Sequence, residues 1–251
     1  MTHRTQPAKS PARALLRRLV PPMRGSLLKE PWREAYAHSI VTKINLHFLE
    51  EIAERIERLG IPGDIVECGV YQGGSAAVLG AAMAKHESDR RLRLFDSFQG
   101  FPEASDRDGE YSRRMVGVGA SDPRIVNSVL RRAGVPMDKV EIVVGLFEDT
   151  FPTAEDRPTA LLHVDSDLYE PVRLTFEKFY SQIPPGGFVV INDYGTFKGS
   201  KEATDEFLAE QGVDLEPVMI DPGAAFFQKP GEGYGGLPKA GHYPGWEGPV
   251  A

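Results

Sequence analysis

Strand and helix signals alternate along most of this chain, and this alternation constrains its fold more than any other feature. Segments typical of buried strands lie at 65–69, 91–97, 140–144, 161–165 and 187–191, and segments typical of helices lie at 75–85, 123–133, 170–182 and 201–211. Strands that alternate with helices need right-handed crossovers, so they form a parallel sheet that helices cover on both faces. The chain is therefore predicted to be an α/β protein with a doubly wound, mostly parallel sheet.

Two further strand-like segments close this pattern, at 215–220 and 224–228. The tight turn Asp221-Pro222-Gly223 joins them, and two strands joined by so short a turn must run antiparallel. We therefore expect a seven-stranded sheet that ends in an antiparallel hairpin.

The remaining segments predict how the chain is organised. Apolar residues at four-residue intervals from Ile40 to Ile56 predict one packing helix over 33–59. We expect a single domain over 33–230, in which the polar insert 98–120 is a lid. Residues 1–32 are expected to form a flexible basic arm, with targeting or an anionic partner as the alternatives, and the Gly/Pro-rich residues 231–251 a tail.

Composition excludes several classes of protein. The 251 residues carry a net charge of −7, although the first 29 hold seven basic side chains and no acidic one. The rest of the chain is therefore strongly acidic, which argues against nucleic acid as a partner. No apolar run is long enough to cross a membrane. The single cysteine, Cys68, can form neither an internal disulfide nor a zinc site. We expect a cytoplasmic protein in which Cys68 fills the core.

A glycine-rich turn follows the first predicted strand. It runs from Glu67 to Ser75 and includes Gly69 and Gly73, directly before a helix. Glycines let a backbone approach a ligand closely, and the amides at the start of a helix favour a carboxylate or a phosphate. Such a turn can also be purely structural, and its spacing departs from the G-x-G-x-x-G of dinucleotide folds.

Asp96 ends the second predicted strand, 27 positions after Gly69. A doubly wound fold places here the acid that binds both ribose hydroxyls of a bound nucleoside. The alternative is an acid that only caps its own loop. Together the turn and Asp96 indicate an adenosine-containing ligand without separating S-adenosylmethionine from NAD.

Polar side chains also follow the two strands next along the chain. Asp165 and Asp167 follow one strand, and Asn192 and Asp193 follow the other. Because the carboxyl ends of parallel strands meet at one edge of a sheet, these side chains should converge. Carboxylate and amide oxygens suit Mg²⁺ or Ca²⁺, which would relieve the repulsion between neighbouring carboxylates. The alternative is that Asp167 caps the helix that starts near Tyr169.

The chain resembles the macrocin O-methyltransferase family between about Gly63 and Lys229. The resemblance rests on four stretches: Gly63-Asp64-Ile65-Val66-Glu67-Cys68-Gly69-Val70; Asp96-Ser97-Phe98 with Gly100-Phe101-Pro102; Asp165-Ser166-Asp167-Leu168-Tyr169-Glu170; and Pro185-Gly186-Gly187 leading into Asn192-Asp193-Tyr194-Gly195. It implies a class I, Rossmann-like methyltransferase that uses S-adenosylmethionine and Mg²⁺ to methylate sugar hydroxyls in natural-product biosynthesis. It also implies a homodimer.

The resemblance further implies roles for single residues. Asp165, Asn192 and Asp193 would hold the metal, and Asp167 would be the general base. The family usually has two aspartates where this chain has Asn192-Asp193, so one charge is missing. The candidate residues for the cofactor are Glu67, Gly69, Tyr71, Gly73, Ser75, Asp96, Ser97 and Phe147.

The chemistry of methyl transfer agrees with these roles. A sugar hydroxyl is a weak nucleophile at neutral pH, so a metal that binds it and a carboxylate that accepts its proton both help. Two alternatives stay open: a catechol or phenol O-methyltransferase with the same metal, and a non-catalytic protein that binds S-adenosylmethionine. An NAD-dependent dehydrogenase is disfavoured by the glycine spacing. We interpret His163 as a core residue and Tyr111, Arg113 and Arg114 of the insert as ordinary loop residues.

Overall fold

Seven strands form one sheet in the computed structural model, which describes residues 29–231. Along the sheet the strands follow the order β3-β2-β1-β4-β5-β7-β6. The strands are β1 (Asp64–Cys68), β2 (Leu92–Asp96), β3 (Val140–Val144), β4 (Thr159–Val164), β5 (Phe188–Ile191), β6 (Val218–Met219) and β7 (Ala225–Gln228). The strands β1 to β5 are parallel, whereas β7 is antiparallel to β5 and to β6. The prediction of a doubly wound sheet with a C-terminal hairpin is confirmed.

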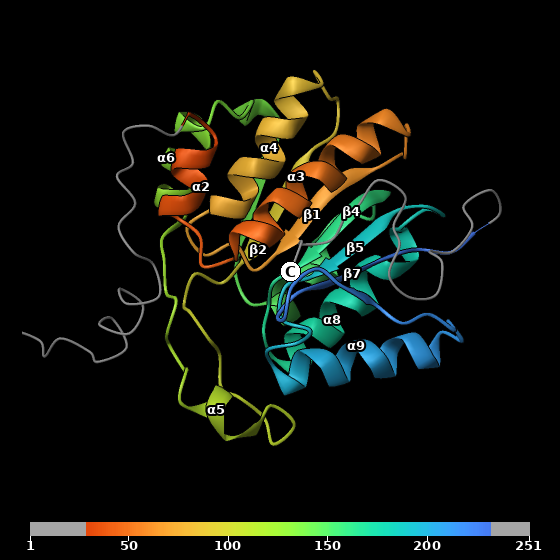
Figure 1. Ribbon diagram of the computed structural model, residues 1–251. Coiled ribbons are helices and arrows are strands. Elements are labelled where there is room, and N and C mark those ends of the chain that lie inside the picture. Colours follow the sequence, from red (N-terminus) through yellow and green to blue (C-terminus); the bar gives the residue numbers. More distant parts are fainter. Residues whose placement is uncertain (1–28, 232–251) are drawn as a thin grey trace, which may run out of the picture.

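Helices cover both faces of this sheet. They are α2 (Trp32–Ala37), α3 (Lys43–Arg58), α4 (Gly74–Lys85), α5 (Gly109–Arg113), α6 (Pro123–Arg132), α7 (Phe147–Thr150), α8 (Tyr169–Phe179) and α9 (Lys198–Glu210). In Figure 1, α2, α3, α4 and α6 lie on one face, whereas α8 and α9 lie on the other. Two buried apolar clusters correspond to these faces, one containing Ile65 and Val190 and the other containing Val66 and Val164.

The predicted packing helix over 33–59 is confirmed for α3 but wrong for the residues before it, because the chain breaks between α2 and α3. Thr42 is extended, and its side chain accepts a hydrogen bond from the Asn45 amide, so α3 begins with its own cap. The apolar spacing did not reveal this break, because Ile40 and Ile44 keep the four-residue interval in the sequence. Both side chains are exposed in the structure.

The lid and the terminal segments were also predicted from the sequence. The insert 98–120 carries the short helix α5, which extends away from the two helical layers (Figure 1). The predicted arm up to residue 28 and the predicted tail from residue 232 lie outside the described residues. Cys68 and His163 are fully buried, as predicted, and burial raises the pKa of the Cys68 thiol.

Strand β2 contains a fully buried arginine. The Nε atom of Arg93 donates to the Oε2 atom of Glu141 on β3 at 3.1 Å, and its guanidinium lies 5.5 Å from the ring centre of Phe95. Its two terminal nitrogens have no hydrogen-bond partner among the described residues. Glu141 is therefore the charge that compensates a buried cation in the strand that leads to Asp96.

Removing that compensation should destabilise the protein. Glu141→Leu leaves the Arg93 cation buried without its partner, so we expect the free energy of unfolding to fall by about 3 kcal/mol in a urea titration. Adding Arg93→Met to the Glu141→Leu variant removes the buried charge and should recover most of that loss. Equal stability of the single and the double variant would contradict this account.

Candidate active site

The carboxyl ends of β1, β4 and β5 lie side by side. The Asp165 amide donates to the Cys68 carbonyl at 2.8 Å, and the Asn192 amide donates to the Val164 carbonyl at 2.8 Å. These bonds continue the parallel register by one residue beyond each strand. Asp165 therefore lies between Gly69 and Asn192, and the predicted convergence of the polar side chains is confirmed.

Strained backbone marks the same edge. Four residues other than glycine have a positive φ among the described residues, and three of them, Tyr71, Phe98 and Asp167, follow β1, β2 and β4. Their φ angles are 52°, 58° and 61°. Such conformations persist only where the surroundings hold them, and they concentrate at functional sites.

The glycine-rich turn brings the backbone of β1 close to that of β4. Gly69 has a φ of 94°, and a Cβ atom there would lie 1.8 Å from the Asp165 carbonyl oxygen. Gly73 is left-handed as well, with a φ of 88°, and it precedes α4. Ser75 in the first turn of α4 is buried. Only glycine allows position 69 to lie so close to the acidic residues.

The carboxylate of Asp96 organises two loops. Its Oδ2 atom accepts from the amides of Val70 at 2.7 Å and Tyr71 at 2.9 Å, and its Oδ1 atom accepts from the Phe98 amide at 2.7 Å. Asp96 therefore caps its own loop, and it also holds the loop that follows β1. A carboxylate has about four acceptor sites, so Asp96 keeps capacity for one further donor.

Three other cofactor candidates have identifiable neighbours. Glu67 is fully buried, and its Oε1 atom lies 2.8 Å from Nδ1 of His163. Burial lowers the pKa of His163, but the hydrogen bond and charge of Glu67 outweigh it, so the pKa is raised overall. The Ser97 hydroxyl accepts from the Gln99 amide, and the Phe147 ring stacks on Phe151 with 4.5 Å between centres.

Asp165, Asp167 and Asp193 form an acidic cluster with little compensation. Burial raises the pKa of each carboxyl group well above its ordinary value, and the charge of a neighbouring aspartate raises it further. The Oδ2 atom of Asp193 is buried and has no hydrogen-bond partner among the described residues. The cluster therefore concentrates negative charge where proteins rarely tolerate it unpaired.

A residue that the sequence did not indicate completes this cluster. Asn45 of α3 is fully buried and donates through Nδ2 to the Oδ1 atom of Asn192 at 2.6 Å. Asn192 in turn donates through its own Nδ2 to Asp165 Oδ1 at 2.7 Å. The two bonds fix the orientation of the Asn192 amide. Asn45 precedes Asn192 by 147 positions, and no local pattern links the two.

Asp167 does not cap the helix that follows it. The cap position of α8 is Leu168, whose side chain makes no such bond, and the Tyr169 amide donates instead to Oδ1 of Asp108 at 2.6 Å. Asp108 belongs to the insert. The alternative that Asp167 is a helix cap is thereby removed, and its carboxyl group remains within the acidic cluster.

The donor chemistry of the cluster suits a hard divalent cation. Asp165 and Asp193 offer carboxylate oxygens, Asn192 offers an amide oxygen, and the partnerless Asp193 oxygen leaves acceptor capacity for a cation. Within residues 29–231, no group of three or more His, Cys, Asp or Glu side chains is arranged as a metal site. The magnesium site therefore stays a prediction that fits the donor set.

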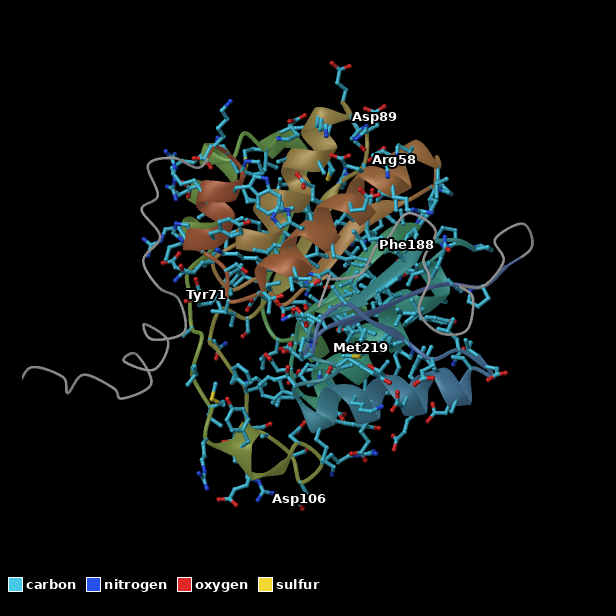
Figure 2. All side chains as sticks on the ribbon, in the orientation of Figure 1. Arg58, Tyr71, Asp89, Asp106, Phe188 and Met219 are labelled. Carbon is cyan, nitrogen blue, oxygen red and sulfur yellow. The ribbon has the colours of Figure 1, made fainter. Side chains whose placement is uncertain are left out.

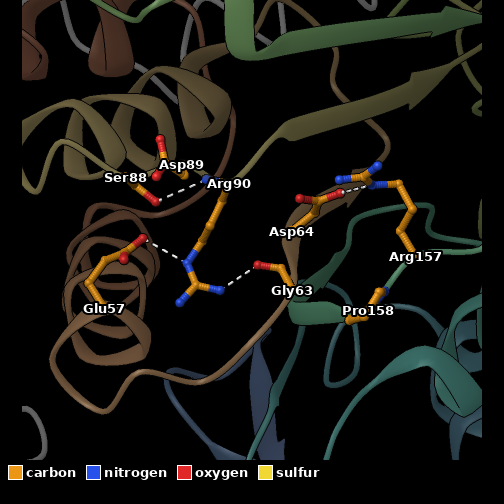
Figure 3. A pocket seen from close by; sticks show the side chains of 8 residues that line it. All are labelled: Glu57, Gly63, Asp64, Ser88, Asp89, Arg90, Arg157 and Pro158. Atoms are coloured by element: carbon orange, nitrogen blue, oxygen red, sulfur yellow. Dashed lines mark hydrogen bonds and ion pairs between the residues drawn. The ribbon is translucent and has the colours of Figure 1, made fainter.

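A cavity of about 450 Å³ lies at the opposite edge of the sheet (Figure 3). Its lining residues are Glu57, Gly63, Asp64, Ser88, Asp89, Arg90, Arg157 and Pro158. Most of its charged groups pair within the lining: Arg90 binds Glu57 and the Gly63 carbonyl, and Arg157 binds Asp64. Asp89 pairs with Lys139 outside the lining. These bonds hold the amino ends of the strands together. The acidic cluster, and not this cavity, is therefore the candidate active site.

The insert approaches the acidic edge through an aromatic cluster. Phe197, which follows β5, lies 5.6 Å from Phe101 and 5.8 Å from Tyr111 between ring centres. Arg113 and Arg114 pair with acids of the insert itself, Asp106 and Glu110, as expected of ordinary loop charges. In Figure 2, Asp106 and Asp89 lie at opposite ends of the molecule, which shows how far the insert extends from the opposite sheet edge.

Comparison with known proteins agrees with this geometry. A family model described as macrocin-O-methyltransferase (TylF) matches residues 25–229. Demethyldecarbamoylnovobiocin O-methyltransferase of Streptomyces niveus is 30% identical over 78% of this chain and 77% of its own length. Mycinamicin III 3''-O-methyltransferase of Micromonospora griseorubida is 32% identical over 77% and 79%.

A solved structure shows the same fold. That of the O-methyltransferase NovP aligns with a TM-score of 0.73 and 26% identity over 87% of this chain and 99% of that one. No helix among the described residues has the length and apolar character that a membrane span requires. The match over most of the sequence, the shared sheet and the glycine turn beside Asp96 lead to one conclusion: the chain belongs to the macrocin O-methyltransferase family and is an S-adenosylmethionine-dependent O-methyltransferase.

Proposed function

We propose that the enzyme methylates a sugar hydroxyl of a natural-product glycoside or nucleotide sugar, with Mg²⁺ bound by Asp165, Asn192 and Asp193 and with Asp167 as the general base. The observation that carries this proposal is the acidic cluster, in which Asp167 is free of any capping role. One relative is named for a substrate that carries a sugar: a 4'-O-methyltransferase of a rhamnosyl-tetracenomycin from Streptomyces olivaceus, which is 32% identical over 80% of this chain.

The proposed cofactor site lies on β1 and β2. Gly69 and Gly73 keep the loop close to the sheet, and Asp96 holds the amides of Val70 and Tyr71 in place while keeping one acceptor site for a ribose hydroxyl. When bound, S-adenosylmethionine supplies an electrophilic methyl group. The chain's own part is to aim that group at the acidic cluster, which begins one strand away at Asp165.

The proposed metal and base lie on the next two strands. When bound, Mg²⁺ would lower the pKa of a sugar hydroxyl and fix its position. Asp167 would accept the proton of that hydroxyl as the hydroxyl oxygen forms its bond to the methyl carbon and the bond between that carbon and the cofactor sulfur breaks. Burial and the charge of Asp165 raise the pKa of Asp167, which makes its carboxylate a stronger base than an exposed one.

The Asp96 assignment predicts a loss of cofactor affinity. Asp96→Ala removes a charge-assisted acceptor from the ribose and releases the loop amides, so we expect S-adenosylhomocysteine to bind about ten- to hundredfold more weakly in calorimetry. Asp89→Ala is the matched control, because Asp89 is an exposed acid at the opposite end of the sheet. Unchanged affinity in Asp96→Ala would rule out its cofactor role.

The metal assignment predicts that chelation stops the reaction without releasing the cofactor. After dialysis against EDTA, we expect turnover of the probe 4-nitrophenyl α-L-rhamnoside to be lost and S-adenosylhomocysteine still to bind, because the two sites use different strands. Asn192→Asp should tighten Mg²⁺ binding in calorimetry by adding a carboxylate. Full activity in excess EDTA would exclude a metal role.

The base assignment predicts a selective loss of rate. Asp167→Asn keeps the size of the side chain, and asparagine tolerates the left-handed backbone at this position as well as aspartate does. We expect kcat to fall by about 10²–10⁴-fold, with the affinities for Mg²⁺ and S-adenosylhomocysteine nearly unchanged. Normal turnover would exclude Asp167 as the base.

The same assays address the alternatives for the substrate. A catechol offered beside the rhamnoside distinguishes a phenol-type methyltransferase from a sugar methyltransferase by the ratio of kcat/KM values. Binding of S-adenosylhomocysteine without turnover of either acceptor would favour a non-catalytic protein. We also propose that the enzyme is a homodimer, which sedimentation can test.

A further inference from the structure

The helix that follows the proposed base has no cap of its own. Helix α8 begins at Tyr169, and Leu168 before it makes no side-chain capping bond. The amide of Tyr169 donates to Asp108 Oδ1 at 2.6 Å, although Asp108 lies 61 positions earlier, in the insert. The first turn of α8 is therefore stabilised by a segment outside the sheet, and Asp167 lies two residues before that bond.

The carboxylate of Asp108 is buried and bound on both sides. Its Oδ2 atom accepts from the amide of Ser105 at 2.8 Å and from the Ser105 hydroxyl at 2.6 Å, and its backbone carbonyl accepts from Ser112 at 2.9 Å. Only 5% of Asp108 is exposed. Its negative charge also lies where the helix dipole of α8 is positive. Asp108 thus joins the folded insert to the start of α8.

Helix α9 leaves space for this contact. Position 199 is a glycine, and a Cβ atom there would lie 1.9 Å from Asp108 Oδ1 and 2.7 Å from the Tyr169 amide nitrogen. Any larger residue would separate the two groups. The glycine is an independent observation that three segments of the chain meet at one hydrogen bond.

The neighbouring arginine holds the same part of the insert in place. The guanidinium of Arg107 lies 3.7 Å from the ring centre of Tyr169 and pairs with Glu202 and Glu206 of α9. The Tyr169 hydroxyl donates to Glu206 at 2.7 Å. Tyr169 is therefore bound at its amide, its ring and its hydroxyl, and two of these three contacts come from the insert.

We propose that Asp108 is a positioning residue for the methyl transfer: by capping α8 from the insert, it fixes the backbone that carries Asp167. Asp167 has a left-handed backbone with a φ of 61°, which needs support from its surroundings. The bond at Tyr169 supplies that support directly after it. The position of the insert and the orientation of Asp167 therefore depend on the same hydrogen bond. This inference rests on the proposed role of Asp167.

Asp108→Ala tests the proposal. We expect kcat for 4-nitrophenyl α-L-rhamnoside to fall about tenfold, a factor that corresponds to the free energy a helix cap typically contributes. KM and the affinity for S-adenosylhomocysteine should stay within about twofold. Hydrogen exchange on the peptide 165–179 should become faster at the start of α8 only. Asp106→Ala is the control: it removes an exposed acid of the insert that pairs with Arg113, leaves the Tyr169 bond intact, and should keep the normal rate.

A double-mutant cycle shows whether Asp108 acts through Asp167. In the Asp167→Asn background, Asp108→Ala should cause no further loss of kcat, because there is no base left to orient. The same tenfold loss in that background would overturn the proposal, and so would unchanged exchange at the start of α8. Gly199→Ala disturbs the contact from α9 with Asp108 intact, and we expect it to reproduce the slower kcat; a normal rate there would also count against the proposal.

The cycle also separates this inference from the proposed function. If Asp167→Asn alone keeps normal turnover, the assignment of the base fails, while the exchange data still report whether Asp108 caps α8. If Asp167→Asn is slow and Asp108→Ala is normal, the base assignment stands and the positioning role fails. The concentration of sites that bind S-adenosylhomocysteine corrects each rate for protein that has not folded.

Discussion

The repulsion between carboxyl groups at one edge of the sheet is the constraint on which the rest of the site depends. Asp165, Asp167 and Asp193 are brought together by the register of β4 and β5, and each raises the pKa of a neighbour. A folded protein keeps such a cluster only when its surroundings supply compensation. Here side-chain donors supply part of that compensation: the amide of Asn192 binds Asp165, and Asn45 in turn holds Asn192, whereas Asp193 Oδ2 has no partner among the described residues.

The sheet sets the positions of these groups, and Gly69 sets how closely the loop after β1 approaches them. Gly69 lies so near the Asp165 carbonyl that a methyl group would not fit. The Asp96 carboxylate then ties the loop after β1 to the loop after β2. The loop proposed to bind the cofactor and the acidic cluster therefore lie at one edge of the sheet, joined by these contacts, which is what a reaction between two bound partners requires.

Much of this could be predicted from the sequence, because the relevant residues follow strands directly. Asp96 ends a strand, and Asp165 and Asn192 directly follow strands, so the strand pattern alone places them at one edge of the sheet, independently of the loop conformations. The break at Thr42 escaped prediction because the apolar period of α3 continues through Ile40, which is exposed. Asn45 and Asp108 escaped for a different reason: their partners lie 147 and 61 positions away, and only the tertiary fold brings them together.

Asn45 and Asp108 belong to two different segments outside the sheet, and each binds a different part of the site. Asn45 of α3 orients Asn192, on the side of the proposed metal, and Asp108 of the insert binds the start of α8, on the side of the proposed base. The sheet edge supplies the positions of both groups, but neither orientation comes from the sheet itself. Loss of the bond between Asp108 and Tyr169 would therefore alter the proposed proton transfer, whereas Asn192 would keep its bond to Asn45, which does not involve the insert.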